Sequence, residues 1–149
     1  MRKIFLSGLS FLIAGTLIIA SGWHSAVYSQ KKKTIILVRH AEKLIPSDED
    51  NRDDPAVNKD DPPLSQAGQQ RAANLAKILK KYKIGEVYST NYSRTRETAE
   101  PTANSRRLKI NFYDAKQNEK LISKIFNSKR KRFLIVGHSN TIPGLVNLW

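Results

Sequence analysis

Two histidines and two arginines carry the chemistry that this sequence suggests. Arg39 and His40 stand side by side directly after the apolar run TIILV, and His138 follows the apolar run FLIVG. Arg94 lies between them, in the segment YSTNYSRTRETA. Arginine grips phosphate oxygens in a bidentate manner, and a neutral imidazole is a competent nucleophile near neutral pH. Together these side chains predict phosphoryl transfer through a covalent phosphohistidine, with charge neutralised by arginine and histidine and no metal required.

These residues can meet only if the fold brings distant strand ends together. The sequence predicts strands over 34–38, 86–89, 109–113 and 132–136, and helices over 65–82, 92–104, 117–127 and from 141 onward. Such an alternation predicts a mostly parallel sheet with helices on both sides, a three-layer α/β/α sandwich. Parallel strands share one carboxyl edge, where α/β sheets bind ligands. His40, Arg94 and His138 would follow the first, second and fourth strands at that edge.

The local patterns give sharper expectations for three of these elements. The unbroken TIILV run predicts a strand that is buried on both faces. Ser65 is a good N-cap, and Gly85 is expected to end the first helix. The second helix is expected to run from Tyr92 to about Asn104 despite Pro101, a residue type that can end or kink a helix. The inward faces expected for the first and third helices comprise Ala72, Leu75, Ile78, Leu79 and Tyr82, and Leu121, Ile122, Ile125 and Phe126.

Composition narrows the classes of partner and cofactor. The chain has 149 residues, a formal net charge of +13 and no cysteine. The charge favours anionic partners, but the lysines are scattered rather than interleaved with aromatic residues, so we expect no nucleic-acid platform. The lack of cysteine excludes disulfides, a thiolate nucleophile and cysteine-ligated metals. We expect one domain that needs no cofactor.

The amino terminus has the layout of a secretory signal peptide. Arg2 and Lys3 precede the apolar segment 4–20, and Val27 and Ser29 occupy suitable −3 and −1 positions. We therefore expect a signal peptide over 1–29, a domain over 30–149 and a periplasmic or secreted location. An uncleaved anchor is the alternative, and in that form the segment would contact the membrane.

The segment 44–63 is rich in acidic residues and proline, so it predicts an irregular surface excursion near the site. It superficially suggests a calcium loop starting at Asp48. Such a loop needs glycine at its sixth position and a carboxylate at its twelfth. Asp53 and Lys59 occupy those positions, so calcium binding is not expected.

Four segments resemble those of the histidine phosphatase superfamily, the phosphoglycerate mutase-like proteins. LVRHAEK resembles the Arg-His-Gly signature, with Ala41 in place of the glycine. The other three, in chain order, are PPLSQAGQQRA, YSTNYSRTRETA and VGHSNTIP. The resemblance covers the chain from Thr34 onward. It implies the superfamily's fold and, through Ala41 in the signature, its small phosphatase branch.

The resemblance also implies a role for each matching residue. His40 would be the phosphorylated nucleophile, with Arg39, Arg94 and His138 completing the phosphate pocket. Arg94 rather than Arg96 takes the place of the second arginine, because it lies four residues before Thr98. The proton donor is expected to be Asp114, with Glu42 as the second candidate. Ser139 and Asn140 would add donors to the substrate.

The resemblance implies a phosphomonoesterase that acts on a small phosphorylated substrate, such as a sugar phosphate or an envelope-glycan phosphate. A protein-phosphohistidine phosphatase and a non-catalytic binder of phosphorylated ligands are the alternatives. Family members usually continue beyond the second-histidine helix, whereas this chain ends at Trp149, so truncation at the carboxyl terminus is expected. The oligomeric state is left open.

Overall fold

The computed structural model describes residues 32–45, 58 and 60–148. The expected signal peptide, Asp48, Asp53, Lys59 and Trp149 lie outside the described residues. The four strands are β1 (Thr34–Arg39), β2 (Glu86–Ser89), β3 (Ile110–Phe112) and β4 (Arg132–Gly137). They form one sheet in the order β1-β4-β2-β3, and every neighbouring pair is parallel.

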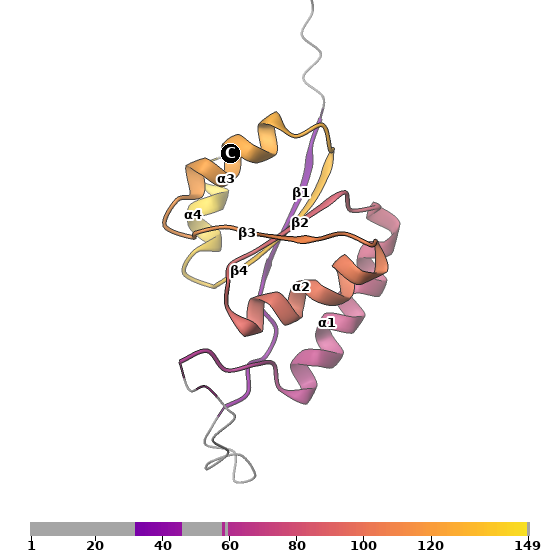
Figure 1. Cartoon of the computed structure of the whole chain (residues 1–149), viewed down its shortest axis with the longest axis vertical. Coiled ribbons are helices and arrows are strands. Elements are labelled where there is room, and N and C mark those ends of the chain that lie inside the picture. Colours follow the sequence, from indigo (N-terminus) through magenta and orange to yellow (C-terminus); the bar gives the residue numbers. More distant parts are fainter. Residues whose placement is uncertain (1–31, 46–57, 59, 149) are drawn as a thin grey trace, which may run out of the picture. The chain divides into compact units, whose positions relative to one another are not determined.

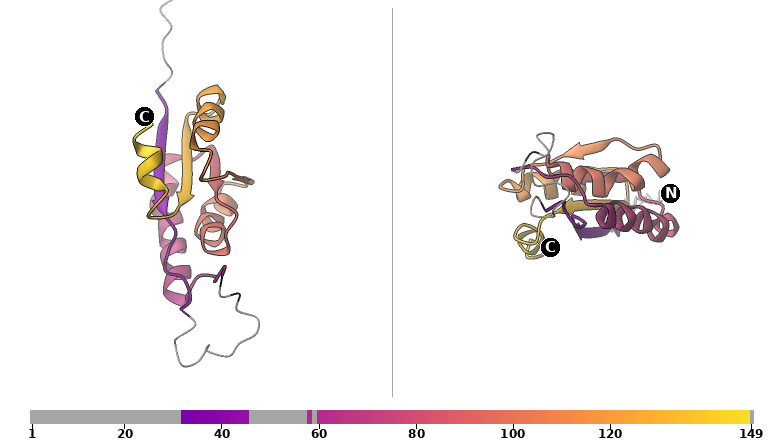
Figure 2. Two further views of the ribbon diagram at one scale, coloured as in Figure 1. Left: turned by 90° about the vertical axis from the view of Figure 1, so that its left-hand side faces the viewer. Right: turned by 90° about the horizontal axis from the view of Figure 1, so that it is seen from below.

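The helices are α1 (Gln66–Leu79), α2 (Ser93–Ser105), α3 (Asn118–Asn127) and α4 (Ile142–Val146), and the short 3₁₀ helix η2 (Lys80–Tyr82) continues α1. They lie on both sides of the sheet, and α1 and α2 lie together, apart from α3 and α4 (Figures 1 and 2). The predicted α/β/α architecture and parallel sheet are therefore confirmed. None of the described helices combines the length and the apolar character needed to cross a membrane.

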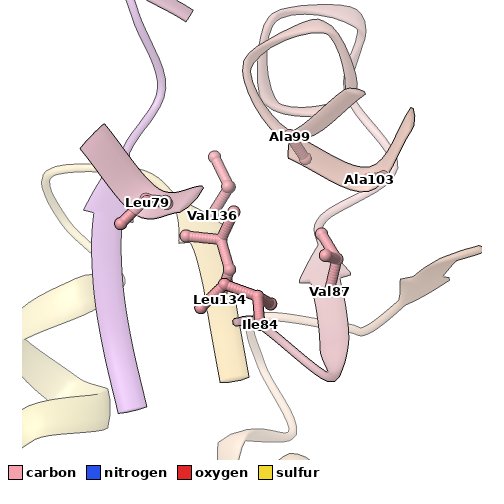
Figure 3. Packing of buried hydrophobic residues seen from close by; sticks show 7 residues of the cluster. All are labelled: Leu79, Ile84, Val87, Ala99, Ala103, Leu134 and Val136. Atoms are coloured by element: carbon pink, nitrogen blue, oxygen red, sulfur yellow. The ribbon is translucent and has the colours of Figure 1, made fainter. Parts of the chain in front are cut away.

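The core follows from the alternation of side chains along β4, the most deeply buried strand. Leu134 and Val136 point to one face and pack with Leu79 of α1 and with Ala99 and Ala103 of α2 (Figure 3). The two alanines are one helical turn apart, and their small side chains let α2 lie close to the sheet. On the other face, buried side chains of α3 and α4 pack against the strands; these are Leu121, Ile122, Ile125 and Leu145.

The prediction that the TIILV strand is buried on both faces is wrong. β1 is an edge strand, because β4 is its only strand partner in the described sheet. Its four central side chains are only partly buried. The strand with that burial is β4, whose run from Phe133 to Gly137 is fully buried because it lies between β1 and β2.

Two helix details also differ from expectation. The α1–η2 segment ends at Lys83, whose φ of 47° is left-handed, rather than at Gly85. Ile78 and Tyr82, expected to point inward, are exposed, because the buried stripe of α1 runs through Ala72 and Leu79. Phe126 is likewise exposed near the end of α3. By contrast, α2 continues through Pro101, and Ser65 caps α1 by accepting a hydrogen bond from the Gly68 amide.

Candidate active site

His40 lies directly after β1 at the carboxyl edge of the sheet. Its amide donates to the carbonyl oxygen of Gly137 at 2.9 Å, so the residue is tied to the end of β4. Its Nδ1 lies 2.7 Å from the carbonyl oxygen of Ala41. A carbonyl can only accept, so Nδ1 carries the hydrogen and Nε2 of the neutral ring keeps its lone pair. No described residue bonds to Nε2, which leaves this nitrogen available as a nucleophile.

Burial lowers the pKa of His40 below its ordinary value of 6.5. The hydrogen bond to Ala41 opposes this shift, while the positive charges of Arg94 and Arg39 add to it. The imidazole is therefore neutral at pH 7. A neutral ring with a fixed tautomer is the form that can attack phosphorus.

His138 follows β4 and lies beside His40. The ring centroids of the two histidines are 5.4 Å apart, and the planes meet at 66°. The Nε2 atom of His138 is 2.9 Å from the hydroxyl oxygen of Thr90, which itself donates to Thr95 at 3.0 Å. Burial, followed by the charge of Arg94, lowers the pKa of His138 to about 4. The imidazole of His138 is therefore neutral, and the buried hydroxyls of Thr90 and Thr95 fix its position.

The histidines line a cavity of about 520 Å³ together with several cationic side chains. Arg39 and Arg94 belong to this lining, as do Lys43 and Arg71, which the sequence reasoning missed. Ser139 and Asn140 line it as well. The structure therefore brings together every residue that was predicted for phosphate binding, and the cavity concentrates positive charge around the free nitrogen of His40.

Arg94 projects from the first turn of α2 and is positioned by two neighbours. Its guanidinium carbon lies 4.6 Å from the centre of the Tyr92 ring, and its Nη1 lies 3.4 Å from a carboxylate oxygen of Asp61. Arg96, by contrast, bonds Asn91 and the Ser93 hydroxyl and is not part of the cavity lining. The choice of Arg94 over Arg96 agrees with this placement.

Asp61 is a functional neighbour that the sequence reasoning missed. Its carboxylate accepts hydrogen bonds from the Ser93 amide at 2.8 and 3.0 Å and from the Ser93 hydroxyl at 2.9 Å. It thereby caps the amino end of α2, where a negative charge is favourable. The cap orders the turn that carries Arg94. The signal available in the sequence was its place directly before the PPLS segment.

The loop that carries the nucleophile is held by α1 and α2. The amide of Ala41 donates to the buried hydroxyl of Thr98 at 2.9 Å, and that hydroxyl donates to the Arg94 carbonyl at 2.7 Å. A Cβ at Gly68 would lie 2.1 Å from the Glu42 carbonyl oxygen. Only glycine therefore lets α1 pack directly on this loop. Thr98 and Gly68 lay within the segments that carry the resemblance, but nothing in the sequence showed what they touch.

Both carboxyl groups that were expected to donate a proton are bonded to other protein groups in this structure. Asp114 lies in a neighbouring cavity that also borders His138, and its oxygens accept from the Lys116 amide at 2.8 Å and from Gln117 Nε2 at 3.0 Å. This is the bonding of a turn that starts a helix. Glu42 lines the main cavity but pairs with Arg71, and its own backbone amide, followed by Arg71, lowers its pKa.

The second-histidine turn depends on Gly137 and Thr141. The His138 amide donates to the Thr141 hydroxyl at 3.0 Å, which closes the turn. A Cβ at Gly137 would lie 2.7 Å from the hydroxyl oxygen of Tyr113. The glycine therefore allows the Tyr113 side chain to support the end of β4. Among the described residues, no group of three or more histidine, aspartate or glutamate side chains is placed to hold a metal ion.

Comparison with known proteins gives one family and a common fold. The family model described as histidine phosphatase superfamily (branch 1) matches residues 35–115. No curated protein is similar to this sequence at a significant level.

Several solved structures share the fold. A protein described as the phosphohistidine phosphatase SixA from Agrobacterium tumefaciens has a TM-score of 0.59 at 20% identity, with 78% of this chain and 76% of that chain covered. A protein described as an α-ribazole-5′-P phosphatase from Escherichia coli gives 0.61 at 15%, covering 78% and 79%. Mycobacterial glucosyl-3-phosphoglycerate phosphatase with inorganic phosphate gives 0.61 at 14%, covering 76% and 77%.

Proposed function

The chain belongs to the histidine phosphatase superfamily and is a phosphatase; on that premise, we propose that it hydrolyses phosphate monoesters through a phosphohistidine formed at Nε2 of His40. One observation carries the proposal. The Nδ1 atom of His40 is bonded to a backbone carbonyl, and its free Nε2 stands in a cavity lined by Arg39, Arg94 and His138.

The reaction follows from the roles of these groups. The Nε2 lone pair attacks phosphorus while Arg39 and Arg94 neutralise the phosphoryl oxygens. The bond between phosphorus and the leaving oxygen breaks, and that oxygen takes up a proton from solvent, which regains one from the attacking water in the next step. Water then attacks the phosphohistidine, the P–N bond breaks, and inorganic phosphate leaves with His40 neutral again. His138, whose Nε2 is bonded to the Thr90 hydroxyl, lines the pocket beside His40 in both steps.

Because neither Asp114 nor Glu42 is available as a proton donor, the site favours substrates with good leaving groups. Both carboxylates expected to act as acids are held, Asp114 by the turn before α3 and Glu42 by Arg71. Aryl phosphates leave as stabilised phenolates, and a phosphoimidazole can take its proton from solvent on the ring nitrogen that is not bonded to phosphorus, so neither class needs a carboxylic acid of the protein. This observation supports a second candidate, the hydrolysis of phosphohistidine, which was an alternative from the start. The expected location outside the cytoplasm instead favours a sugar or glycan phosphate.

The test is a comparison of the full chain with His40→Ala on an aryl phosphate. The wild-type protein should release phosphate and, when quenched during turnover, carry a phosphoryl group that is labile in acid and stable in alkali. His40→Ala should lose both properties. Equal phosphate release by the two proteins would refute the assignment of the nucleophile. Binding of the substrate with no turnover by the wild-type protein would instead support a non-catalytic phosphate binder.

Leaving-group dependence separates the two substrate classes. If no strong acid acts, kcat/KM should fall steeply from aryl phosphates to alkyl and sugar phosphates. Phosphoimidazole should then be hydrolysed faster than a sugar phosphate. A flat dependence would show that an efficient proton donor acts and would favour the ester substrates.

A further inference from the structure

The edge of the sheet opposite the candidate active site is strongly basic. The chain turns there three times, at 80–83, 106–109 and 129–132, and these turns read KKYK, RRLK and KRKR. They follow α1, α2 and α3, so each closes the amino-terminal edge of the sheet. Figure 1 shows that the end of α3 lies beside the starts of β1 and β4. We call this surface the basic edge.

The three turns converge on one shallow hollow. A depression of about 340 Å³ is lined by Lys83, Arg106 and the run 129–132, with Ile84 and Gly85 at its base. Arg106 Nε donates to the Ile84 carbonyl at 3.2 Å, which fixes that side chain against the surface. The cations are therefore gathered by the fold, although the sequence shows them as separate clusters.

Almost nothing neutralises this charge within the described part of the chain. Glu86 is the one described carboxylate at the basic edge, and its oxygens accept hydrogen bonds from the Tyr88 and Ser128 hydroxyls. The ion pairs among the described residues, Arg71 with Glu42 and Arg94 with Asp61, lie at the active-site edge. The net positive charge is thus concentrated on the face that lacks the catalytic groups.

The basic residues are present even where the backbone favours another residue. Lys83 and Arg107 have φ values of 47° and 52°, and they end the segments of α1 and α2. Glycine or asparagine is usual in this left-handed conformation at helix ends. Basic residues near a helix carboxyl end do interact well with the helix dipole. That effect is confined to the last turn and does not account for KRKR, which continues into β4.

Exposed apolar side chains border the same edge. Phe126 is 60% exposed and Tyr82 is 38% exposed, and both lie in the last turns of the helical segments that end there. Basic residues flanked by exposed apolar and tyrosine side chains are the composition of surfaces that lie on lipid headgroups. A nucleic-acid platform would need several stacking rings interleaved with the cations, whereas the exposed aromatic side chains named at this edge are Tyr82, within KKYK, and Phe126, before KRKR.

We propose that the basic edge binds the anionic headgroups of a phospholipid bilayer. β1 starts at this edge and runs from it toward the candidate active site. The six residues of β1 separate the basic edge from His40, a distance of about 20 Å at 3.3 Å per residue. In this orientation the active site faces the aqueous phase, and substrate enters without crossing the lipid surface.

The test measures binding of the full chain to two kinds of vesicle. Flotation is compared on phosphatidylcholine vesicles with and without phosphatidylglycerol, and the ratio of the two partition coefficients is the readout. Insertion of an apolar segment contributes to both, so the ratio isolates headgroup charge. Each basic residue at an anionic surface contributes about fivefold to binding. The ratio should therefore be well above one and should collapse at high salt.

Two double variants locate the contact. The double variant Lys83→Asn, Arg107→Asn removes two positive charges, and asparagine suits the left-handed backbone at both positions. It should lower the ratio of the two partition coefficients by about 25-fold without lowering the unfolding temperature. The matched control, Arg96→Gln with Lys120→Gln, removes two charges near the other edge and should change the ratio by no more than about twofold, because those charges lie beyond the screening length.

Equal losses in the two double variants would overturn the proposal, because net charge would then explain the binding. A ratio near one for the wild-type protein would also overturn it. If that protein instead bound a single-stranded oligonucleotide, and the Lys83→Asn, Arg107→Asn variant lost this binding, the basic edge would belong to a nucleic-acid partner.

Discussion

Replacing Thr98 by valine should weaken both the stability of the domain and its catalysis. Valine keeps the branched shape of threonine and removes only the hydroxyl. That hydroxyl accepts the Ala41 amide at 2.9 Å and donates to the Arg94 carbonyl at 2.7 Å. It therefore joins the loop of the nucleophile to the helix of the second arginine.

The size of the effect follows from burial. Ala41 is 3% exposed and Thr98 is 1% exposed, so water cannot replace the lost partner of the amide. A buried amide without an acceptor costs about 1–3 kcal/mol. For a domain of this size, each kcal/mol lowers the unfolding temperature by roughly 4 °C. We expect a loss of about 4–12 °C, because no new packing compensates.

Catalysis should fall for a separate reason. The carbonyl of Ala41 fixes the Nδ1 hydrogen of His40, so movement of this residue misaligns Nε2. A displacement of about 1 Å can cost about 100-fold in rate. We expect kcat on an aryl phosphate to fall by about 10–100-fold, while KM changes less because Arg39 and Arg94 remain.

The assays are thermal unfolding by circular dichroism and steady-state kinetics, with Thr98→Ser as the matched control. Serine keeps the hydroxyl and removes a methyl group, so it should restore most of kcat even if stability is reduced. A valine variant with wild-type kcat and unfolding temperature would refute the reasoning. Equal losses of kcat in both variants would show that packing, not the hydrogen bonds, matters.

Three further predictions concern the same edge of the sheet. Gly68→Ala should destabilise the domain by about 1–3 kcal/mol and reduce kcat, because its Cβ would meet the Glu42 carbonyl oxygen at 2.1 Å; urea unfolding measures the first effect, and Ala67→Gly is the control. The folded-state pKa of His138, about 4, lies below its ordinary value of 6.5, so the unfolded chain binds the proton in this interval. The contribution of His138 to the free energy of unfolding should be fully present above pH 6.5 and should be lost as the pH falls toward 4. His138→Asn should make the unfolding temperature depend less on pH over this range. An unfolding temperature of the wild-type protein that is constant between pH 6.5 and 4 would contradict the lowered pKa. Asp114→Asn and Glu42→Gln should each leave kcat/KM on an aryl phosphate within about threefold, since neither carboxylate is free to act as the acid; a selective loss on an alkyl phosphate in one variant would identify it as the acid after all.

The fold was largely predictable because each element carries a local signal. The period-two and helical patterns, the Ser65 cap and the apolar runs are properties of short segments, and the parallel sheet follows from their alternation. The strand that is central was not predictable in the same way. TIILV and RFLIV have the same apolar character, and only the order of pairing makes β4 central and β1 an edge.

The candidate site likewise contains residues that could be predicted from the sequence and residues that could not. Arg39, His40, Arg94 and His138 were predicted because their residue types carry the chemistry, and the structure places them around one cavity. Thr90, Thr98 and Asp61 were missed, because each acts on a residue far away in the sequence through a single hydrogen bond. Threonine and aspartate are common on surfaces and in turns, so their type alone gives no signal.

The sheet order also bears on when an active molecule can exist during synthesis. β4 lies between β1 and β2, so β1 and β2 do not hydrogen-bond to each other. Both pair with β4, which is synthesised much later. His40 and His138 are roughly 100 residues apart, and contacts of such long sequence separation form slowly. An emerging chain therefore carries the nucleophile long before it carries a phosphate pocket. Hydrolytic activity should arise in one step, when β4 inserts between β1 and β2, and shorter chains should be inert toward phosphorylated compounds around them.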